Sequence, residues 1–316
     1  MRVLLRVLIF AVLAAVAAWG AVAVAAEAAS RTARPRGEMI DIGGRKLRLV
    51  CEGPRSDRPV VWLEAGAFSG AADFAALQQI LAARGLRSCA YDRAGMGWSD
   101  RGPSPRDGDA IAADLEALVK ASGERGPFVL VGHSMAGLYM RQFAVRNPDQ
   151  VVGLVLVDAV TPDMMAIPDA QKFIDAATSL SGLGAAAGTL WLTKPLYWMP
   201  DRIGLPGFGL AEKRRGFVSG RQARTAYAEV KQWRAAAAQA KAAGDLDPEW
   251  PVAVVTAGSR SGRMAEWNAI RNAPATAARH GMVDNVDEAT HTSVLGRTWG
   301  ERVARGVDFV IAAARP

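Results

Sequence analysis

Cysteine and histidine are scarce in this chain, which has only two cysteines and three histidines among its 316 residues. These few residues do not form the closely spaced Cys, His and carboxylate pattern of a protein-bound metal site. A glycine-rich loop of the kind that cradles phosphates is also missing. We therefore expect no metal and no cofactor. Long polar low-complexity tracts are absent, and disorder is not indicated.

Clustered charge is the next thing that the sequence lacks. The formal net charge is +7, but the basic residues are scattered, with small groups only at 31–36 and 213–215. No recognisable nucleic-acid-binding module accompanies the charge, so we expect no nucleic-acid partner. Attraction to an anionic membrane surface fits the excess positive charge better. Half of the residues are hydrophobic, which is enough to bury a sizeable core.

The N-terminal segment contains one long uncharged run, at residues 7–26, preceded by Arg2 and Arg6. A helix of about 20 apolar residues can span a bilayer, which favours an uncleaved membrane anchor. A small-x-small sequence at 23–25 leaves a cleaved signal peptide as the alternative. Either interpretation sends the globular part across a membrane. We expect it to face the periplasm or the cell exterior, or to be secreted after cleavage.

Short apolar runs alternate with segments of helical spacing along most of the chain, which predicts a mostly parallel sheet with helices on both faces. The alternation stops near Thr161 and resumes at Val252. The expected organisation is an N-terminal segment at 1–30, a linker at 31–38, an α/β core at 39–160 and 249–316, and a helical insertion at 161–248. Strands are predicted at 39–51 (as a hairpin around Gly43-Gly44), 60–63, 87–91, 128–131, 151–157, 252–256 and 282–286, and helices at 72–83, 109–122, 138–145 and 301–314.

The strongest motif is a strand, a sharp turn and a helix start at residues 128–137, with Ser134 on the turn. Such an elbow exposes a serine hydroxyl at the C-terminal end of a strand, and the helix start favours developing negative charge. The strict Gly-x-Ser-x-Gly pattern is not met, because Ala136 stands two residues after the serine and Gly137 comes next. We predict that Ser134 is a nucleophile. The alternative is an ordinary glycine-containing turn with a capping serine.

Three further segments, at 63–67, 91–100 and 155–159, carry a likeness to a known family. Together with the elbow they resemble the α/β-hydrolase superfamily, particularly its lid-bearing esterase-like and peptidase-like serine hydrolases. The resemblance covers the chain from about residue 39 to the C-terminus and is weakest over the insertion. It implies an eight-stranded, mostly parallel sheet and a helical lid over Ser134.

The same resemblance implies an oxyanion hole made of two backbone N–H groups, those of Met135 and Ala67. The residue after the nucleophile gives the first donor, and the loop at 63–67 gives the second. Many relatives begin this loop with His-Gly, whereas this chain has Glu-Ala-Gly at 64–66.

A serine hydroxyl is a weak nucleophile and needs an adjacent base, and histidine suits neutral pH. His133 adjoins Ser134, but neighbours on an elbow point to different sides, so we expect it to serve packing and turn geometry. His280 precedes the last predicted strand, at the wrong end of the sheet. His291 follows that strand, where the resemblance puts the catalytic histidine. We predict that His291 is the base, with a surface-loop histidine as the alternative.

A carboxylate should orient this histidine. In most relatives it follows the seventh strand, but residues 256–263 contain no carboxylate. Some relatives place it after the sixth strand, where Asp158 stands here. Because the ends of parallel strands face one crevice, Asp158 could reach His291; the alternative is that Asp158 only caps a turn. The other candidates for the acid are Glu266, Asp284 and Asp287.

The resemblance also bears on the two cysteines. In this fold the second and fourth strands are neighbours in the sheet, and Cys51 and Cys89 lie on those predicted strands. In an oxidising compartment a disulfide between them is a reasonable hypothesis. The alternative, two small buried hydrophobic residues, stays open.

Hydrolysis of a carboxylic ester through an acyl-enzyme is the leading hypothesis, with Ser134 as nucleophile, His291 as base and Asp158 as acid. The Trp, Leu and Met residues of the insertion could line an apolar pocket for an acyl chain or an aromatic group. A serine aminopeptidase or amidase is the second interpretation. A catalytically idle protein that binds a ligand at the membrane is the third. Dehalogenase and epoxide hydrolase are disfavoured, because those relatives use an aspartate at the elbow.

Overall fold

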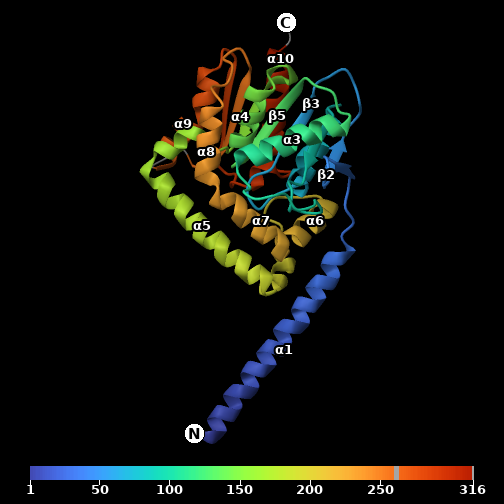
Figure 1. The fold of residues 1–316 in the computed structure, drawn as a ribbon, viewed down its shortest axis with the longest axis vertical. Helices are drawn as coiled ribbons and strands as arrows, with labels where there is room; N and C mark the ends of the chain where they lie inside the picture. Colours follow the sequence, from blue (N-terminus) through green and yellow to red (C-terminus); the bar gives the residue numbers. More distant parts are fainter. Residues whose placement is uncertain (260–262, 315–316) are drawn as a thin grey trace.

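The computed structural model of the protein describes residues 1–259 and 263–314. A mostly parallel sheet of eight strands runs through its body, as predicted (Figure 1). Its strands lie in the order β1-β2-β4-β3-β5-β6-β7-β8. Only β2 runs antiparallel to its neighbours β1 and β4. The strands are β1 (Glu38–Asp41), β2 (Lys46–Glu52), β3 (Val60–Glu64), β4 (Ser88–Tyr91), β5 (Phe128–His133), β6 (Val151–Val157), β7 (Val252–Ala257) and β8 (Gly281–Val286).

Helices cover both faces of this sheet, and alternate residues of each strand serve the two layers. On β5, Val129 and Val131 pack with α2 and α10, whereas Phe128 and Leu130 pack with α3 and α4. This two-residue period is what a strand buried on both faces requires. The layers are α2 (Ala75–Ala83) and α10 (Gly300–Ala313) on one face, and α3 (Gly108–Ser122), α4 (Ala136–Arg146) and α9 (Arg263–Ala277) on the other.

The stretch from 161 to 248 is helical, as predicted, and lies between β6 and β7. Its first long helix, α5, packs along α7, and both lie below the C-terminal ends of the strands in Figure 1. Its last helix, α8, returns along α3 and α4. The helices are α5 (Pro168–Thr189), α6 (Gly207–Phe217), α7 (Gly220–Lys231) and α8 (Trp233–Ala242), with short 3-10 helices η3 (Pro162–Ala166) and η4 (Lys194–Trp198).

The N-terminal run forms one helix, α1 (Arg2–Thr32), which continues into the segment expected to be a linker. It projects away from the body on the side of α5, α6 and α7 (Figure 1). Its last turns pack on the insertion, where Ala26 and Ala29 contact Tyr197 and Val218. Among the described residues, α1 is the helix that is long and apolar enough to cross a membrane.

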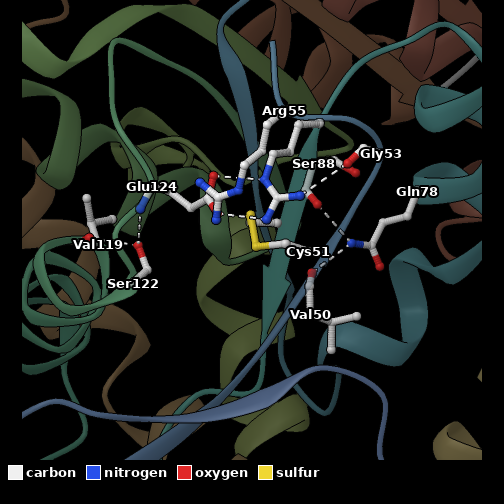
Figure 2. Close-up of a disulfide and its surroundings, with 11 residues drawn as sticks. Val50, Cys51, Gly53, Arg55, Gln78, Ser88, Val119, Ser122 and Glu124 are labelled. Atoms are coloured by element: carbon white, nitrogen blue, oxygen red, sulfur yellow. Dashed lines mark hydrogen bonds and ion pairs between the residues drawn. A yellow bond between two sulfur atoms is a disulfide. The ribbon is translucent and has the colours of Figure 1, made fainter.

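Cys51 and Cys89 face each other on the antiparallel pair β2 and β4, and a disulfide joins them. Figure 2 places this bond beside Glu124, whose carboxylate pairs with Arg55 at 2.8 Å and Arg87 at 2.7 Å. Cys89 lies near the start of β4, so the disulfide ties the end of the sheet that is remote from the candidate site.

One local prediction differs from the structure. The helix expected at 72–83 begins instead as a 3-10 helix, η1 (Ala71–Phe74), followed by α2. The Asp73 carboxylate accepts from the Gly70 N–H at 3.0 Å and so stabilises a tight first turn. This is the capping-box arrangement that starts a helix, so the helical segment begins one residue earlier than predicted and its first turn is 3-10.

Candidate active site

Ser134 stands on the turn between β5 and α4 with φ at +57°. A non-glycine residue adopts this left-handed conformation at a cost, and such residues gather at functional sites. Main-chain bonds from the neighbouring strand hold the turn. The Ser134 N–H donates to the Val157 carbonyl at 3.1 Å, and the Ser134 carbonyl accepts from the Val160 N–H at 2.8 Å. The chain around β6 thereby fixes the elbow.

The elbow tolerates alanine at 136 because the tight approach falls one residue later. A Cβ atom on Gly137 would come within 2.5 Å of the Val160 carbonyl oxygen, whereas Ala136 packs in an apolar cluster. The loop after β3 lies directly against the serine, since a Cβ atom on Gly66 would come within 2.6 Å of Ser134 Cβ. The departure from Gly-x-Ser-x-Gly thus leaves the turn intact.

His291 and Asp158 are 133 residues apart in sequence but meet at the ends of the parallel strands. His291 Nδ1 lies 2.5 Å from Asp158 Oδ2. Asp158 follows β6 directly and has φ at +42°. Its own N–H donates to the Val255 carbonyl at 2.7 Å, which holds this residue at the carboxyl end of the sheet.

Arg271 on α9 contacts the other oxygen of Asp158, with Nη1 2.8 Å from Oδ1. Burial raises the pKa of Asp158, but the hydrogen bond from His291 and the charge of Arg271 outweigh it, so the pKa lies below the ordinary 3.8. Asp158 is therefore an anion at neutral pH. Sequence reasoning missed Arg271, because no motif surrounds it and only the packing of α9 brings it here.

His133 packs against His291, with ring centroids 4.6 Å apart. Its Nε2 donates to the His291 backbone carbonyl at 2.8 Å, which identifies the tautomer, since a carbonyl only accepts. Burial and then the neighbouring His291 lower the pKa of His133 to about 3. A neutral His133 therefore supports the loop that carries His291, a contact that goes beyond the turn geometry expected for it.

The remaining sequence candidates have other contacts. Asp284 pairs with Arg302, and Asp287 accepts from the Asn285 amide. Glu266 is exposed on α9, and His280 precedes β8, at the opposite end of that strand from His291. Of the stretch at 256–263, residues 260–262 lie outside the described part of the chain.

Arg93 joins the loop after β3 to the insertion. Its guanidinium donates to the carbonyls of Ala65 and Gly66, the latter at 2.9 Å. It also pairs with Glu64 and with Glu229 on α7, each at 2.7 Å, and all three charged side chains are buried. Burial raises the pKa of Glu64, and the charge of Arg93 opposes that rise. Glu64, which stands in place of the usual histidine, is thus part of a buried ion-pair cluster.

A cavity of about 490 Å³ opens over Ser134 and His291, and Met135 and Ala67 line it as well. A cavity of this size holds a small organic ligand. Its lining also includes the ionisable side chains of Asp201, Arg202, Lys213, Arg214 and His291. The large apolar side chains of its wall come mainly from the insertion and include Phe173, Leu196, Met199, Leu210, Phe217 and Trp233.

Comparisons with known proteins agree with this architecture. A sequence model of the α/β hydrolase fold matches residues 59–188. The enol-lactonase from Burkholderia xenovorans superposes with a TM-score of 0.60, covering 86% of this chain and 99% of that chain at 18% identity. Residues 59–188 thus match the α/β-hydrolase family, and the chain has the fold of that superfamily. The resemblance found in the sequence is therefore confirmed at the level of the superfamily and its fold.

Two further proteins are similar to this chain, one over its whole fold and one over part of its length. An epoxide hydrolase superposes with a TM-score of 0.62, covering 88% of this chain and 99% of that chain at 18% identity. An uncharacterised protein of Schizosaccharomyces pombe is 27% identical over 245 residues, which are 73% of this chain and 42% of that protein. The chain thus spans less than half the length of this curated relative. At such identities the structural likeness concerns the fold alone.

Proposed function

We propose that this α/β-hydrolase is a serine hydrolase that cleaves carboxylic esters through an acyl-enzyme. The observation that carries the proposal is the 2.5 Å contact between Asp158 Oδ2 and Nδ1 of His291, which lines the same cavity as Ser134. Serine, histidine and an ionised carboxylate at the rim of one cavity are the groups that such chemistry needs.

In the proposed reaction, Ser134 Oγ attacks the ester carbonyl carbon while His291 Nε2 takes the hydroxyl proton. The tetrahedral intermediate then expels the alcohol, which leaves with that proton, and the acyl group stays on Ser134. Water, deprotonated by His291, attacks the acyl-enzyme and releases the carboxylic acid. Asp158 accepts the His291 Nδ1–H throughout and stabilises the imidazolium, for which its lowered pKa suits it.

The proposed oxyanion donors are the N–H groups of Met135 and Ala67. Arg93 supports this assignment for Ala67. In a trans peptide the carbonyl and the following N–H point in opposite directions. Because the Gly66 carbonyl faces Arg93 at 2.9 Å, the Ala67 N–H faces away from that guanidinium, and Ala67 itself lines the cavity. One such donor lowers a barrier by about 3 kcal/mol.

The cavity wall supports an uncharged or acidic substrate over a free amine. Asp201 is the one carboxylate among the described lining residues, and its oxygens accept from the N–H groups of Ile203 at 2.9 Å and Leu205 at 2.6 Å. Arg202, Lys213 and Arg214 are cations. A serine aminopeptidase would need an available acceptor for an ammonium group, so the apolar wall favours an acyl chain or an aromatic ester.

We also propose that the insertion acts as a lid and that α1 anchors the enzyme to a membrane. The apolar part of α1 is almost entirely exposed, which leaves a bilayer as its natural surroundings. A cleaved signal peptide is the competing proposal. N-terminal sequencing of the mature protein distinguishes the two: a chain that retains residues 1–30 supports the anchor, and one that starts after position 25 contradicts it.

A fluorophosphonate probe tests the catalytic proposal. The wild-type chain and Ser69→Ala should be labelled, whereas Ser134→Ala should not. Ser69 is the matched control, because it lines the same cavity. A panel of p-nitrophenyl esters and aminoacyl anilides then measures the preference, which we expect to favour esters. A folded wild-type protein that resists the probe would instead support a catalytically idle binding protein.

A further inference from the structure

The end of α1 meets the insertion at the level where an anchor helix would leave the bilayer. Residues 7–26 are the uncharged part of α1 and would span about 30 Å as a helix. Directly after them, Glu27 pairs with Lys194 of η4, and the Ala29 carbonyl accepts from the Tyr197 hydroxyl at 3.2 Å. These contacts put η4 at the expected membrane–water boundary.

Around η4 the insertion exposes large apolar side chains, which we name the apolar rim. Trp191 precedes η4 and Trp198 is its last residue, and tryptophan prefers the interfacial region of a bilayer. Trp198 packs edge-on against Tyr197, which itself contacts α1, so the rim is continuous with the anchor. The members of the apolar rim are Leu183, Leu190, Trp191, Leu192 and Trp198, each of them exposed.

Next to the rim lies a recess of about 400 Å³ between α1, α5 and α7, which we name the basic recess. Trp191 lines it, and so does Glu27, the one acidic residue among the described residues of its lining. Its basic lining residues are Arg31, Lys194, Arg215, Arg221 and Arg224.

Arg31 pairs with Glu27 at 2.9 Å, whereas the guanidinium groups of Arg221 and Arg224 have uncharged partners in the contacts described. Arg221 donates to the Ser99 carbonyl at 2.7 Å, and Arg224 donates to the Thr189 hydroxyl at 2.7 Å. Burial, and then the neighbouring charge of Arg221, lower the pKa of Arg215. Positive charges held this close repel one another, and phosphate groups would relieve that repulsion.

From this arrangement we propose that the apolar rim and the basic recess together form a docking surface for a bilayer that carries anionic lipids. The rim enters the interface, and the recess takes lipid phosphate groups. The proposal rests on α1 being an uncleaved anchor, as proposed above. Leu196 and Met199, next to the rim, also line the cavity over Ser134, so docking brings the cavity mouth to the lipid surface.

An environment-sensitive fluorophore at Leu192→Cys tests the docking. Both native cysteines are in the disulfide, so the new thiol can be labelled selectively. The full chain is reconstituted in nanodiscs of phosphatidylcholine, with or without phosphatidylglycerol. We expect a blue-shifted emission, quenched by nitroxide-bearing lipids, in the anionic discs. High salt should reverse much of the shift.

Charge variants separate docking from simple anchoring. Arg31→Gln with Arg224→Gln should lower the ratio of docked to undocked probe by about 30-fold, since each basic residue near an anionic surface contributes about fivefold. Arg125→Gln, an exposed arginine between α3 and β5, is the matched control and should leave the ratio unchanged. Water-like emission in anionic discs, or equal effects of the two sets of variants, would overturn the proposal.

Fluorophosphonate labelling of the same samples keeps this proposal separate from the catalytic one. An undocked chain that is labelled at Ser134 overturns the docking surface alone. A docked chain that resists the probe supports the docking surface and contradicts the serine hydrolase.

Discussion

The helices α2, α3, α4 and α10 meet the sheet through apolar side chains, whereas the insertion meets the body through several buried charges. The sheet's two faces are filled by two large apolar clusters. At the seam with the insertion, Glu229 pairs with Arg93 and Glu212 pairs with Arg48, and these four side chains are almost fully buried. Lys213 on α6 also pairs with an acid of η1, at 2.7 Å.

These two kinds of contact have different consequences for the candidate site. Apolar burial stabilises a fold without demanding one geometry. An ion pair taken out of water contributes little net stability, but losing one partner leaves an uncompensated charge. Ser134, Asp158 and His291 therefore lie at the edge of a sheet that apolar packing stabilises. A few charges, in contrast, determine where the insertion and the loop at 63–67 lie.

The largest effect is expected at the edge of the sheet that carries the candidate catalytic residues. Asp158→Asn should lower kcat by about 10³–10⁴-fold, because the amide favours the wrong tautomer of His291. Steady-state hydrolysis of a p-nitrophenyl ester measures it. Asp163→Asn is the control, since Asp163 is exposed and pairs with Lys241. Near-normal turnover in Asp158→Asn would remove Asp158 from the proposed triad.

At the seam the expected loss is one of stability. Arg93→Met should lower the free energy of unfolding by about 3–5 kcal/mol, because Glu64 and Glu229 stay buried without their cation. Arg55→Met is the control, since Arg55 is largely exposed where it pairs with Glu124, and it should cost about 1 kcal/mol at most. Urea unfolding compares the two variants.

The pH dependence of that loss distinguishes a seam of charges from an apolar contact. Buried carboxylates without a cation have raised pKa values, so the folded variant binds more protons than the unfolded chain above about pH 4.5. The destabilisation by Arg93→Met should therefore grow as the pH rises from acidic to neutral. A loss that is constant over this range would mean that Arg93 acts through packing alone.

Gly66 lies between Ser134 and Arg93, in the loop after β3. Gly66→Ala should impair the reaction more than the fold. The new Cβ atom would displace the Ser134 side chain, and a misplaced reacting group costs about 10²-fold in rate. The control is Gly184→Ala on α5, where a Cβ atom meets nothing within 4 Å. If Gly66→Ala keeps full turnover, the loop after β3 does not constrain the nucleophile.

Much of the candidate site at the edge of the sheet could be predicted from the sequence, because local patterns encode it. The elbow around Ser134 and the buried strands are contiguous motifs, and parallel strands bring their ends to one edge, which placed Asp158 near His291 in advance. The seam could not be predicted in this way. Arg93, Glu229 and Arg271 are single charged residues on separate elements, and only tertiary packing reveals that they are buried partners.

Near neutral pH the smallest effect concerns His133, which is buried beside His291 and has no charged partner of its own in the contacts described. In the unfolded chain a histidine takes up a proton below about pH 6.5, whereas the folded His133 stays neutral down to about pH 3. The unfolded state therefore binds the additional proton between these values, and stability falls as the pH drops, by at most about 1.4 kcal/mol per pH unit.

His133→Asn should remove that component, so the difference in unfolding free energy between the variant and the wild type should shrink or reverse as the pH falls from 6.5. Urea unfolding at several pH values measures it, with His280→Asn as the control because His280 is exposed. Because His133 also donates to the His291 carbonyl at 2.8 Å, the same variant should lower kcat modestly. Parallel stability curves for the variant and the wild type would mean that His133 titrates normally in the folded protein. That outcome would contradict a neutral His133 that supports the loop carrying His291.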